Sequence, residues 1–314
     1  MDILGSFNIT QFADDITISG NLYISGPTNV YSSTSTTRTV NLQGNFRDDN
    51  AYFGDYTNNL KLKFTGSADQ EFYYNDGYWA QLRNTFELAK TGGSKVKLTN
   101  SIHDNGGIQQ GLTIPAGQIF DLNGFDLEIG TAFSNSGTLI LKGDELVTTT
   151  QPTNNTGSWV KYTATTGSRS IKDWGYKNIE IAGAGTFVFD ITTPDFNEIK
   201  SSTPNAKLTF ENGVTVTVVD FNVNGTSGNP IVLRSDSTGV DWLLDVSGTD
   251  TVSYVDVKDS DASAGEQIDD TVGGNNSGNN TNWLFPTPPT PSASLLTNYS
   301  RGSRRGRVKV KMVD

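Results

Sequence analysis

Three closely spaced carboxylates are the first candidates for chemistry in this chain. They lie in the segment DVKDSDAS, at Asp256, Asp259 and Asp261, and a second acidic pair is Asp48 and Asp49. Paired acids cleave polysaccharides, and clustered acids also bind Ca²⁺. Neither segment has the ligand spacing of an EF-hand loop or of a nonapeptide calcium repeat. Acidic residues in turns are most often only solvated, so we assign no catalytic residue here and keep Ca²⁺ as a weak cofactor candidate.

The sequence offers little other machinery for catalysis. Cys is absent, which excludes a thiol nucleophile and a Cys-ligated metal site. The single histidine, His103, lies in NSIHDNGG, which predicts a surface turn. No GxSxG motif, Walker A loop or GxGxxG motif accompanies it. We therefore expect a protein that is not an enzyme.

The densest aromatic cluster of the chain is the candidate binding site. It consists of Phe72, Tyr73, Tyr74, Tyr78 and Trp79. Aromatic faces suit carbohydrate, so these side chains would form a sugar-stacking platform. The alternative is that they fill the core or a contact between subunits, which is the commoner use of aromatic residues. Both interpretations remain open from sequence.

The C-terminal segment joins a proline-rich linker at residues 286–291 to a basic tail at 292–314. The tail carries a net charge of +5 and the rest of the chain −16, which indicates electrostatic docking of the tail on an acidic protein surface. In RVKVKMV, apolar and basic side chains alternate, as in an amphipathic strand that pairs with a neighbouring subunit. The alternatives are a solvated tail and nucleic-acid binding, although the acidic body would repel DNA. The candidate anchoring residues are Arg301, Arg304, Arg305, Arg307, Val308, Lys309, Val310, Lys311 and Met312.

The element that must position these candidates is a repeat of short strands in Leu112 to Gly143. Its glycines, from Gly117 to Gly143, are spaced 7, 6, 7 and 6 residues apart. Between them, apolar residues recur two apart, as in Leu139 and Leu141, which predicts strands with one face buried. Tight turns between short strands are typical of a β-solenoid, although Asn123-Gly124 would also fit a hairpin.

Composition supports an all-β class. Charged residues are 18% and aromatic residues 10% of the 314 residues, and Gly numbers 33. The aromatic content is too high for a disordered chain. No stretch approaches the roughly 20 apolar residues of a membrane span. The start, MDILGSFNIT, carries no export signal. This fits a virion protein released by lysis, a fragment of a larger secreted protein, or a protein whose signal has been removed, and the initial Met1 favours the first.

The rest of the chain divides by pattern. Residues 1–66 predict a less regular N-terminal β region, and 67–285 the body of the solenoid. Residues 79–89 fit either a short helix or a strand, and strand is favoured. Trp283, Leu284 and Phe285 are expected to plug the end of the apolar core.

Several segments resemble the strand-turn repeats of large bacterial surface and secreted β-solenoid proteins, and related repeats of phage virion proteins. They include FELAKTGGSKVKLTN, LTIPAGQIFDLNGFDLEIG and IKDWGYKNIEIAGAGTFVFD, and the resemblance covers about residues 60–285. It implies a right-handed parallel β-helix with a capped C-terminal end and an extended tail. These repeats serve as stalks, adhesins and enzyme scaffolds alike, so the resemblance constrains function weakly.

These observations lead to one expected function and two alternatives. The first is a non-enzymatic structural protein of a phage virion, as capsid decoration, head fibre or tail fibre. It would bind other virion proteins through its tail, form a homotrimer, and bind neither nucleic acid nor membrane. The alternatives are a secreted or cell-surface adhesin that binds host glycans, and a polysaccharide depolymerase.

Overall fold

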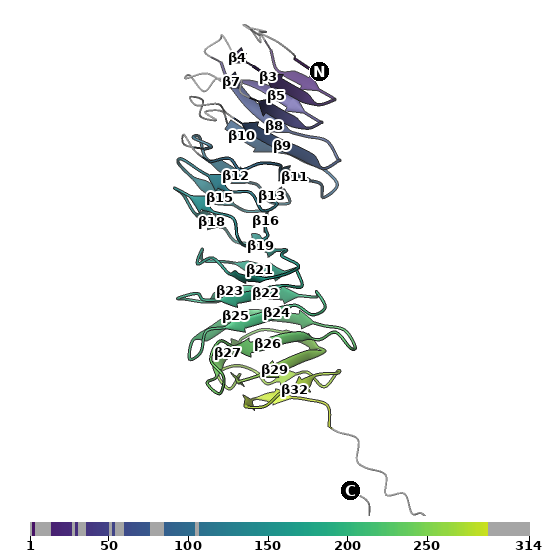
Figure 1. The fold of residues 1–314 in the computed structure, drawn as a ribbon, viewed down its shortest axis with the longest axis vertical. Coiled ribbons are helices and arrows are strands. Elements are labelled where there is room, and N and C mark those ends of the chain that lie inside the picture. Colours follow the sequence, from purple (N-terminus) through teal and green to yellow (C-terminus); the bar gives the residue numbers. More distant parts are fainter. Residues whose placement is uncertain are drawn as a thin grey trace, which may run out of the picture.

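The structure is a computed structural model and describes residues 2–3, 14–26, 29–30, 36–49, 52–53, 60–75, 85–103 and 107–287. Every regular element in these residues is a β-strand. The strands form a parallel β-solenoid of about 11 turns, which confirms the predicted all-β class and architecture. Figure 1 shows the coils stacked in chain order, from β3 near the N-terminus to β32 at the other end. The right-handed sense of the winding stays a prediction.

One parallel sheet of 15 strands follows the whole length of the rod. β28 (Asp250–Ser253) joins this sheet beside β25. Its other strands, in order along the rod, are β1 (Asp2–Ile3), β3 (Leu22–Ser25), β6 (Phe46–Asp49), β9 (Gln70–Asn75), β11 (Lys95–Leu98), β13 (Ile119–Asp121), β16 (Thr138–Leu141), β19 (Trp159–Tyr162), β21 (Asn178–Ile181), β23 (Asp195–Ser201), β25 (Thr215–Asn224), β27 (Trp242–Val246), β30 (Ser260–Asp261) and β33 (Asn280–Thr281).

Shorter parallel sheets form the other sides of the rod. A four-stranded sheet contains β2 (Ile16–Ile18), β5 (Arg38–Leu42), β8 (Leu60–Phe64) and β10 (Thr85–Leu88). A three-stranded sheet contains β12 (Leu112–Ile114), β15 (Phe133–Asn135) and β18 (Pro152–Asn154). A six-stranded sheet contains β20 (Ser168–Ser170), β22 (Thr186–Phe189), β24 (Lys207–Phe210), β26 (Ile231–Ser235), β29 (Val255–Lys258) and β32 (Asn275–Asn276). The two-stranded sheets pair β4 (Asn29–Val30) with β7 (Tyr52–Phe53), β14 (Leu127–Glu128) with β17 (Val147–Thr148), and β31 (Ile268–Asp269) with β34 (Trp283–Leu284).

The glycine spacing of the central stretch corresponds to one third of a coil. β12, β13 and β14 follow one another in one coil and pair with β15, β16 and β17 of the next. Hydrogen bonds between neighbouring coils join residues 19 positions apart here, as between Asn135 and Asn154, and 26 apart near the N-terminus, as between Asn45 and Glu71. Each coil of this stretch therefore holds three short strands separated by tight turns.

The Asn123-Gly124 turn connects two sides of one coil and is not a hairpin. Both residues have positive φ, 53° and 89°, a region that Asn and Gly enter at low cost. The strands on either side, β13 and β14, pair with β16 and β17 of the next coil rather than with each other. The solenoid interpretation is therefore the right one of the two that the sequence allowed.

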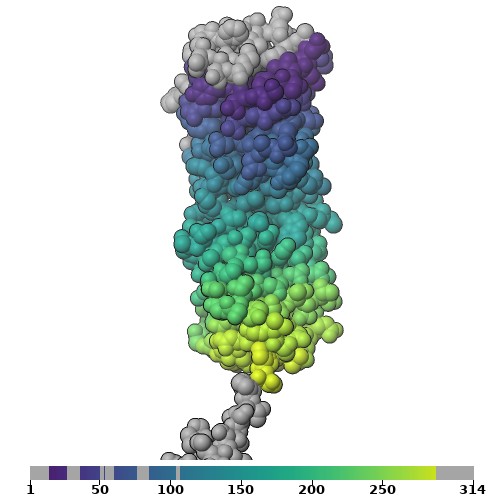
Figure 2. Space-filling view, turned by 90° about the vertical axis from the view of Figure 1, so that its right-hand side faces the viewer, coloured from purple at the N-terminus to yellow at the C-terminus, as the bar shows by residue number. Residues whose placement is uncertain are grey.

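The core is one continuous column of buried side chains along the axis of the rod. Alternate residues of each strand point inward, and the predicted pairs Leu112/Ile114 and Leu139/Leu141 are all buried. Aromatic rings contact one another between coils: Phe46 packs edge to face on Phe72 at 5.7 Å, and Phe210 stacks on Trp242 at 4.1 Å, centroid to centroid. Figure 2 shows the result as a rod with colour bands in chain order. Each coil therefore depends mainly on its two neighbours for burial.

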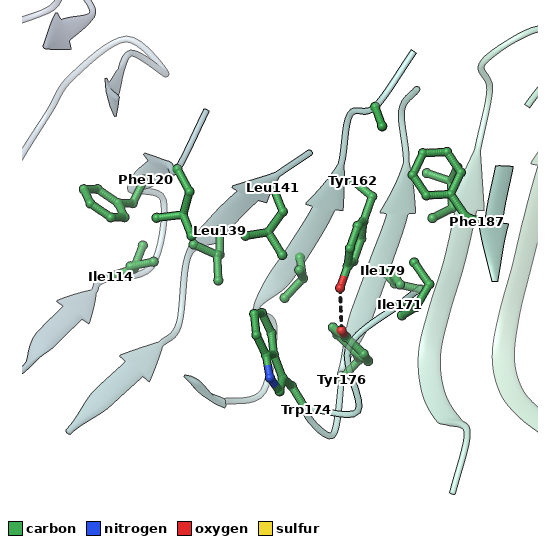
Figure 3. Close-up of a cluster of buried hydrophobic side chains, with 14 of the residues drawn as sticks. Ile114, Phe120, Leu139, Leu141, Tyr162, Ile171, Trp174, Tyr176, Ile179 and Phe187 are labelled. Carbon is green, nitrogen blue, oxygen red and sulfur yellow. Dashed lines mark hydrogen bonds between the residues drawn. The ribbon is translucent and has the colours of Figure 1, made fainter. Parts of the chain in front are cut away.

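Several polar groups inside the rod are paired between neighbouring segments. The hydroxyls of Tyr162 and Tyr176 lie 2.8 Å apart in the core, where they face each other in Figure 3. Burial raises the pKa of both phenols, so both stay protonated. Asn135 Nδ2 donates to Asn154 Oδ1 at 2.9 Å, and Asn154 Nδ2 donates to the carbonyl of Trp174. These contacts avoid the cost of an unpaired buried polar group.

Three smaller features of the structure lie at positions that the sequence analysis singled out. Residues 85–88 form strand β10, in agreement with the favoured assignment for this stretch. The large sheet continues across residues 66 and 67, because β6 pairs with β9. At the C-terminal end, Trp283 and Phe285 stack at 6.1 Å over the core and act as the predicted plug, whereas Leu284 points outward and is exposed.

Coil-to-coil packing predicts the effect of one glycine substitution. A Cβ on Gly183 would overlap the carbonyl oxygen of Ala164 on the preceding coil, which is backbone and cannot move aside. We expect Gly183→Ala to lower the stability of these coils by about 1–3 kcal/mol, measured by urea unfolding. Gly20→Ala is the control, because a Cβ at Gly20 meets open space. Equal unfolding midpoints for the two variants would contradict this packing.

Candidate functional site

The predicted aromatic cluster is divided between the two faces of strand β9. Phe72 and Tyr74 point into the core and are 1% and 6% exposed, so their rings are not available to a ligand on the surface. Tyr73 lies between them and points outward, half-buried. Tyr78 and Trp79 lie outside the described residues. Among the described members of the predicted platform, Tyr73 is the one that reaches the surface.

Tyr73 belongs to a column of side chains from three neighbouring coils. Tyr23 on β3 pairs in register with Arg47 on β6, which pairs with Tyr73 on β9. The guanidinium carbon of Arg47 lies 4.0 Å from the ring centroid of Tyr73 and 5.3 Å from that of Tyr23. Two cation–π contacts thus hold Arg47 between two tyrosine rings.

An ion pair fixes the orientation of the Arg47 side chain. Its Nη2 lies 2.8 Å from Oδ2 of Asp49, on the same strand. The hydrogen bond from Arg47 lowers the pKa of Asp49, and the hydrogen bond to Asp49 raises the pKa of Arg47. Both groups are therefore fully charged at neutral pH, and each neutralises the other.

A second column runs parallel to the first on the outer face of the same sheet. The Oδ1 atom of Asn21 accepts a hydrogen bond from the backbone N–H of Asn45 at 2.9 Å. Asn45 Oδ1 accepts from the backbone N–H of Glu71 at 2.8 Å, one coil further along. The Glu71 carboxylate lies 3.4 Å from Nζ of Lys97. The backbone thereby orients the two amides, and Lys97 neutralises Glu71.

The two columns enclose a groove of about 340 Å³ on the outer face of the large sheet. Its lining residues are Asn21, Leu22, Tyr23, Asn45, Phe46, Arg47, Glu71, Tyr73 and Thr99. The groove offers aromatic surface, amides, a guanidinium and a carboxylate, which together suit a ligand rich in hydroxyl groups. Sequence reasoning identified only Tyr73. The signal that identifies the others is their recurrence at intervals of one coil, 24 and 26 residues.

The predicted acidic candidates have partners within the protein. Asp256 Oδ2 lies 2.8 Å from Nη2 of Arg234, and Asp261 Oδ1 accepts from the backbone N–H of Ser263. Asp259 is 3% exposed and accepts hydrogen bonds from Gly239 N and Asn279 Nδ2. In the part of the chain that the structure describes, no three Asp, Glu or His residues are grouped to hold a metal ion.

The remaining predicted positions give no further site. Asp48 is buried while Asp49 faces outward, so this pair does not share one surface. His103 is exposed, as the sequence predicts. The basic tail, from Arg301 to Met312, lies outside the described residues. Within residues 2–287, as far as they are described, no helix is long and apolar enough to cross a membrane.

The fold defines the chain as a parallel β-solenoid protein. No family model, curated protein or solved structure matches it. The bacterial or phage character inferred from the resemblance therefore belongs to the proposals that follow.

Proposed function

We propose that this protein is a non-enzymatic structural component of a phage virion, in which the solenoid projects as a decoration protein, head fibre or tail fibre. The observation that carries the proposal is the continuous rod. One 15-stranded sheet and one core run through all described coils, so the body is a rigid spacer along its whole length. A rod of this kind separates whatever binds at its two ends.

Paired charges on the outer faces support a structural role. Lys95 Nζ lies 2.6 Å from Asp121, and Lys161 Nζ lies 3.0 Å from Glu180, each on the next coil. On the four-stranded sheet, Glu87 lies 3.0 Å from Lys61 and 2.6 Å from Lys63. Each exposed pair contributes little by itself, up to about 1 kcal/mol. Repeated between coils, the pairs favour the stacked register and add to rigidity.

The basic tail supplies the attachment in this proposal. Its alternating apolar and basic residues, Val308 to Met312, would form a strand that is added to a sheet edge of another virion protein. The strongly acidic balance of the rest of the chain argues against attachment to nucleic acid. A homotrimer of such rods, located in the virion, completes the proposal.

Deletion of Pro286–Asp314 tests the attachment. We expect particles assembled with the truncated protein to lack it, because the anchoring strand is gone. The truncated body should still fold, since the described coils end with the plug formed by Trp283 and Phe285. Far-ultraviolet circular dichroism of the truncated protein is the folding control. Undiminished incorporation into particles would overturn the proposed role of the tail.

A glycan-binding adhesin is the second candidate function. The groove beside Tyr73 favours this function. A structural rod alone does not require the oriented amides of Asn21 and Asn45, or an arginine held between two tyrosine rings, on one face. The two functions are compatible, since a projecting virion rod is well placed to contact a host surface.

A further inference from the structure

We propose that the groove between Tyr23, Arg47 and Tyr73 binds a neutral oligosaccharide that lies along the axis of the rod. This inference goes beyond the structural role and does not depend on it. It places a glycan site on β3, β6 and β9, on the outer face of the large sheet. Of the described residues of the aromatic cluster predicted from sequence, this site uses Tyr73.

The charges of the lining residues indicate a neutral ligand. The ionised side chains in the lining are Arg47 and Glu71, and each has a partner of opposite charge, Asp49 at 2.8 Å and Lys97 at 3.4 Å. The groove therefore has no unbalanced positive charge to hold a polyanion such as nucleic acid. Hydroxyl groups suit it better, because they donate to carboxylate and amide oxygens and accept from amide and guanidinium N–H groups.

The binding groups are held in place before any ligand arrives. The backbone N–H of Glu71 donates to Asn45 Oδ1 and so orients this amide. The rings of Tyr23 and Tyr73 hold the Arg47 guanidinium from both sides. A preorganised site loses less conformational entropy on binding. More of the interaction free energy then remains as affinity, even when the contact area is small.

The arrangement of the two columns indicates a chain-like ligand. Neighbouring strands are about 4.8 Å apart, so Tyr23 and Tyr73 lie about 10 Å apart along the rod. The amide and carboxylate column, from Asn21 to Glu71, covers the same length beside them. A ligand with hydroxyl groups repeated along its length would use both columns, whereas a single sugar would use only part of them.

An array of bacterial surface oligosaccharides, probed with the full chain, tests the inference. We expect neutral oligosaccharides to bind, and uronic-acid-containing oligosaccharides and single-stranded DNA not to bind. Tyr73→Ala and Glu71→Gln should each weaken binding of the best neutral oligosaccharide by about tenfold or more, measured by calorimetry. Glu71→Gln keeps the size of an exposed side chain, so it is the variant least able to disturb the fold.

Trp159→Ala is the matched control. Trp159 is also an outward-facing aromatic residue of the large sheet, with the ammonium of Lys200 5.7 Å from its ring, but it lies four strands further along the rod. Its removal should leave binding unchanged. The inference would be overturned if no neutral oligosaccharide bound, or if only acidic oligosaccharides or DNA bound. It would also be overturned if Trp159→Ala and Tyr73→Ala lowered the affinity equally.

The outcome is separable from the virion proposal. Deletion of the tail should not change binding to the array, and Glu71→Gln should not change incorporation into particles. Failure of one proposal therefore leaves the other intact.

Discussion

Trp242→Ala is expected to destabilise the C-terminal coils by about 3–5 kcal/mol. The indole is completely buried on β27 and stacks at 4.1 Å and 18° on Phe210 of the six-stranded sheet. It thus fills the space between two sides of the rod. The loss combines the hydrophobic burial of the ring with the cost of the cavity it leaves.

Trp242→Phe is the control that separates ring packing from the indole N–H. Among the described residues, Trp242 Nε1 has no hydrogen-bond partner, although it is buried. Phenylalanine keeps an aromatic ring against Phe210 and removes this unsatisfied donor. We therefore expect Trp242→Phe to lose much less stability than Trp242→Ala, because the smaller ring and the removed donor act in opposite directions.

Hydrogen exchange is the measurement that fits a solenoid. Coils interact mainly with their neighbours, so damage at Trp242 should remain local. Backbone amides of β27, β30 and β33 should lose protection in Trp242→Ala, while those of β3, β6 and β9 keep it. Loss of protection along the whole rod would show that the molecule unfolds as one unit, contrary to this expectation.

The architecture was predictable because its cause is local. Apolar residues two apart, such as Leu139 and Leu141, fix which face of a strand is buried, and glycine or asparagine fixes where the chain turns. The same rule was available for the aromatic cluster. In Phe72-Tyr73-Tyr74, alternation places Tyr73 on the opposite face from its two neighbours, as the structure confirms.

The groove was not predictable, because its cause is long-range. Tyr23, Arg47 and Tyr73 come together only through the pairing of three coils. Coil length differs along the chain, and a shift of one residue would turn every outward side chain inward. Local patterns give the strands but not the number of residues between equivalent positions. The sequence around each groove residue therefore contains no local pattern that marks it as part of a site.

Asp270→Asn is expected to stabilise the C-terminal end of the rod at pH 8 by up to about 4 kcal/mol. Asp270 is completely buried after β31, and neither carboxylate oxygen has a hydrogen bond of normal geometry among the described residues. Burial raises its pKa to about 7, the charge of Asp269 adds to this, and the backbone amides of Val255 and Tyr254 oppose it only in part. The shift from 3.8 corresponds to about 3 pH units.

The sign of this effect follows from the direction of the shift. The folded state holds the proton of Asp270 more tightly than the unfolded chain, so the wild type loses stability as pH rises from about 4 to about 7. Above pH 7, the buried carboxylate is charged, and the free energy that its charge costs the folded state no longer changes with pH. Asparagine has nearly the same size and no charge, so its advantage should be small near pH 4 and full at pH 8.

Hydrogen exchange of the last coils measures this difference, with both proteins compared at each pH so that the intrinsic exchange rate cancels. Asp269→Asn is the matched control, because Asp269 is exposed and its backbone-bonded carboxylate has a lowered pKa. Removing that charge weakens the hydrogen bonds from Thr271 but also relieves the repulsion of Asp270, so the net change at pH 8 should be small. A pH-independent difference between Asp270→Asn and the wild type would mean that the buried group is already neutral at pH 8 or has found a partner. In that case, the packing of Asp270 against Gly274 would account for its burial without any titration near neutral pH.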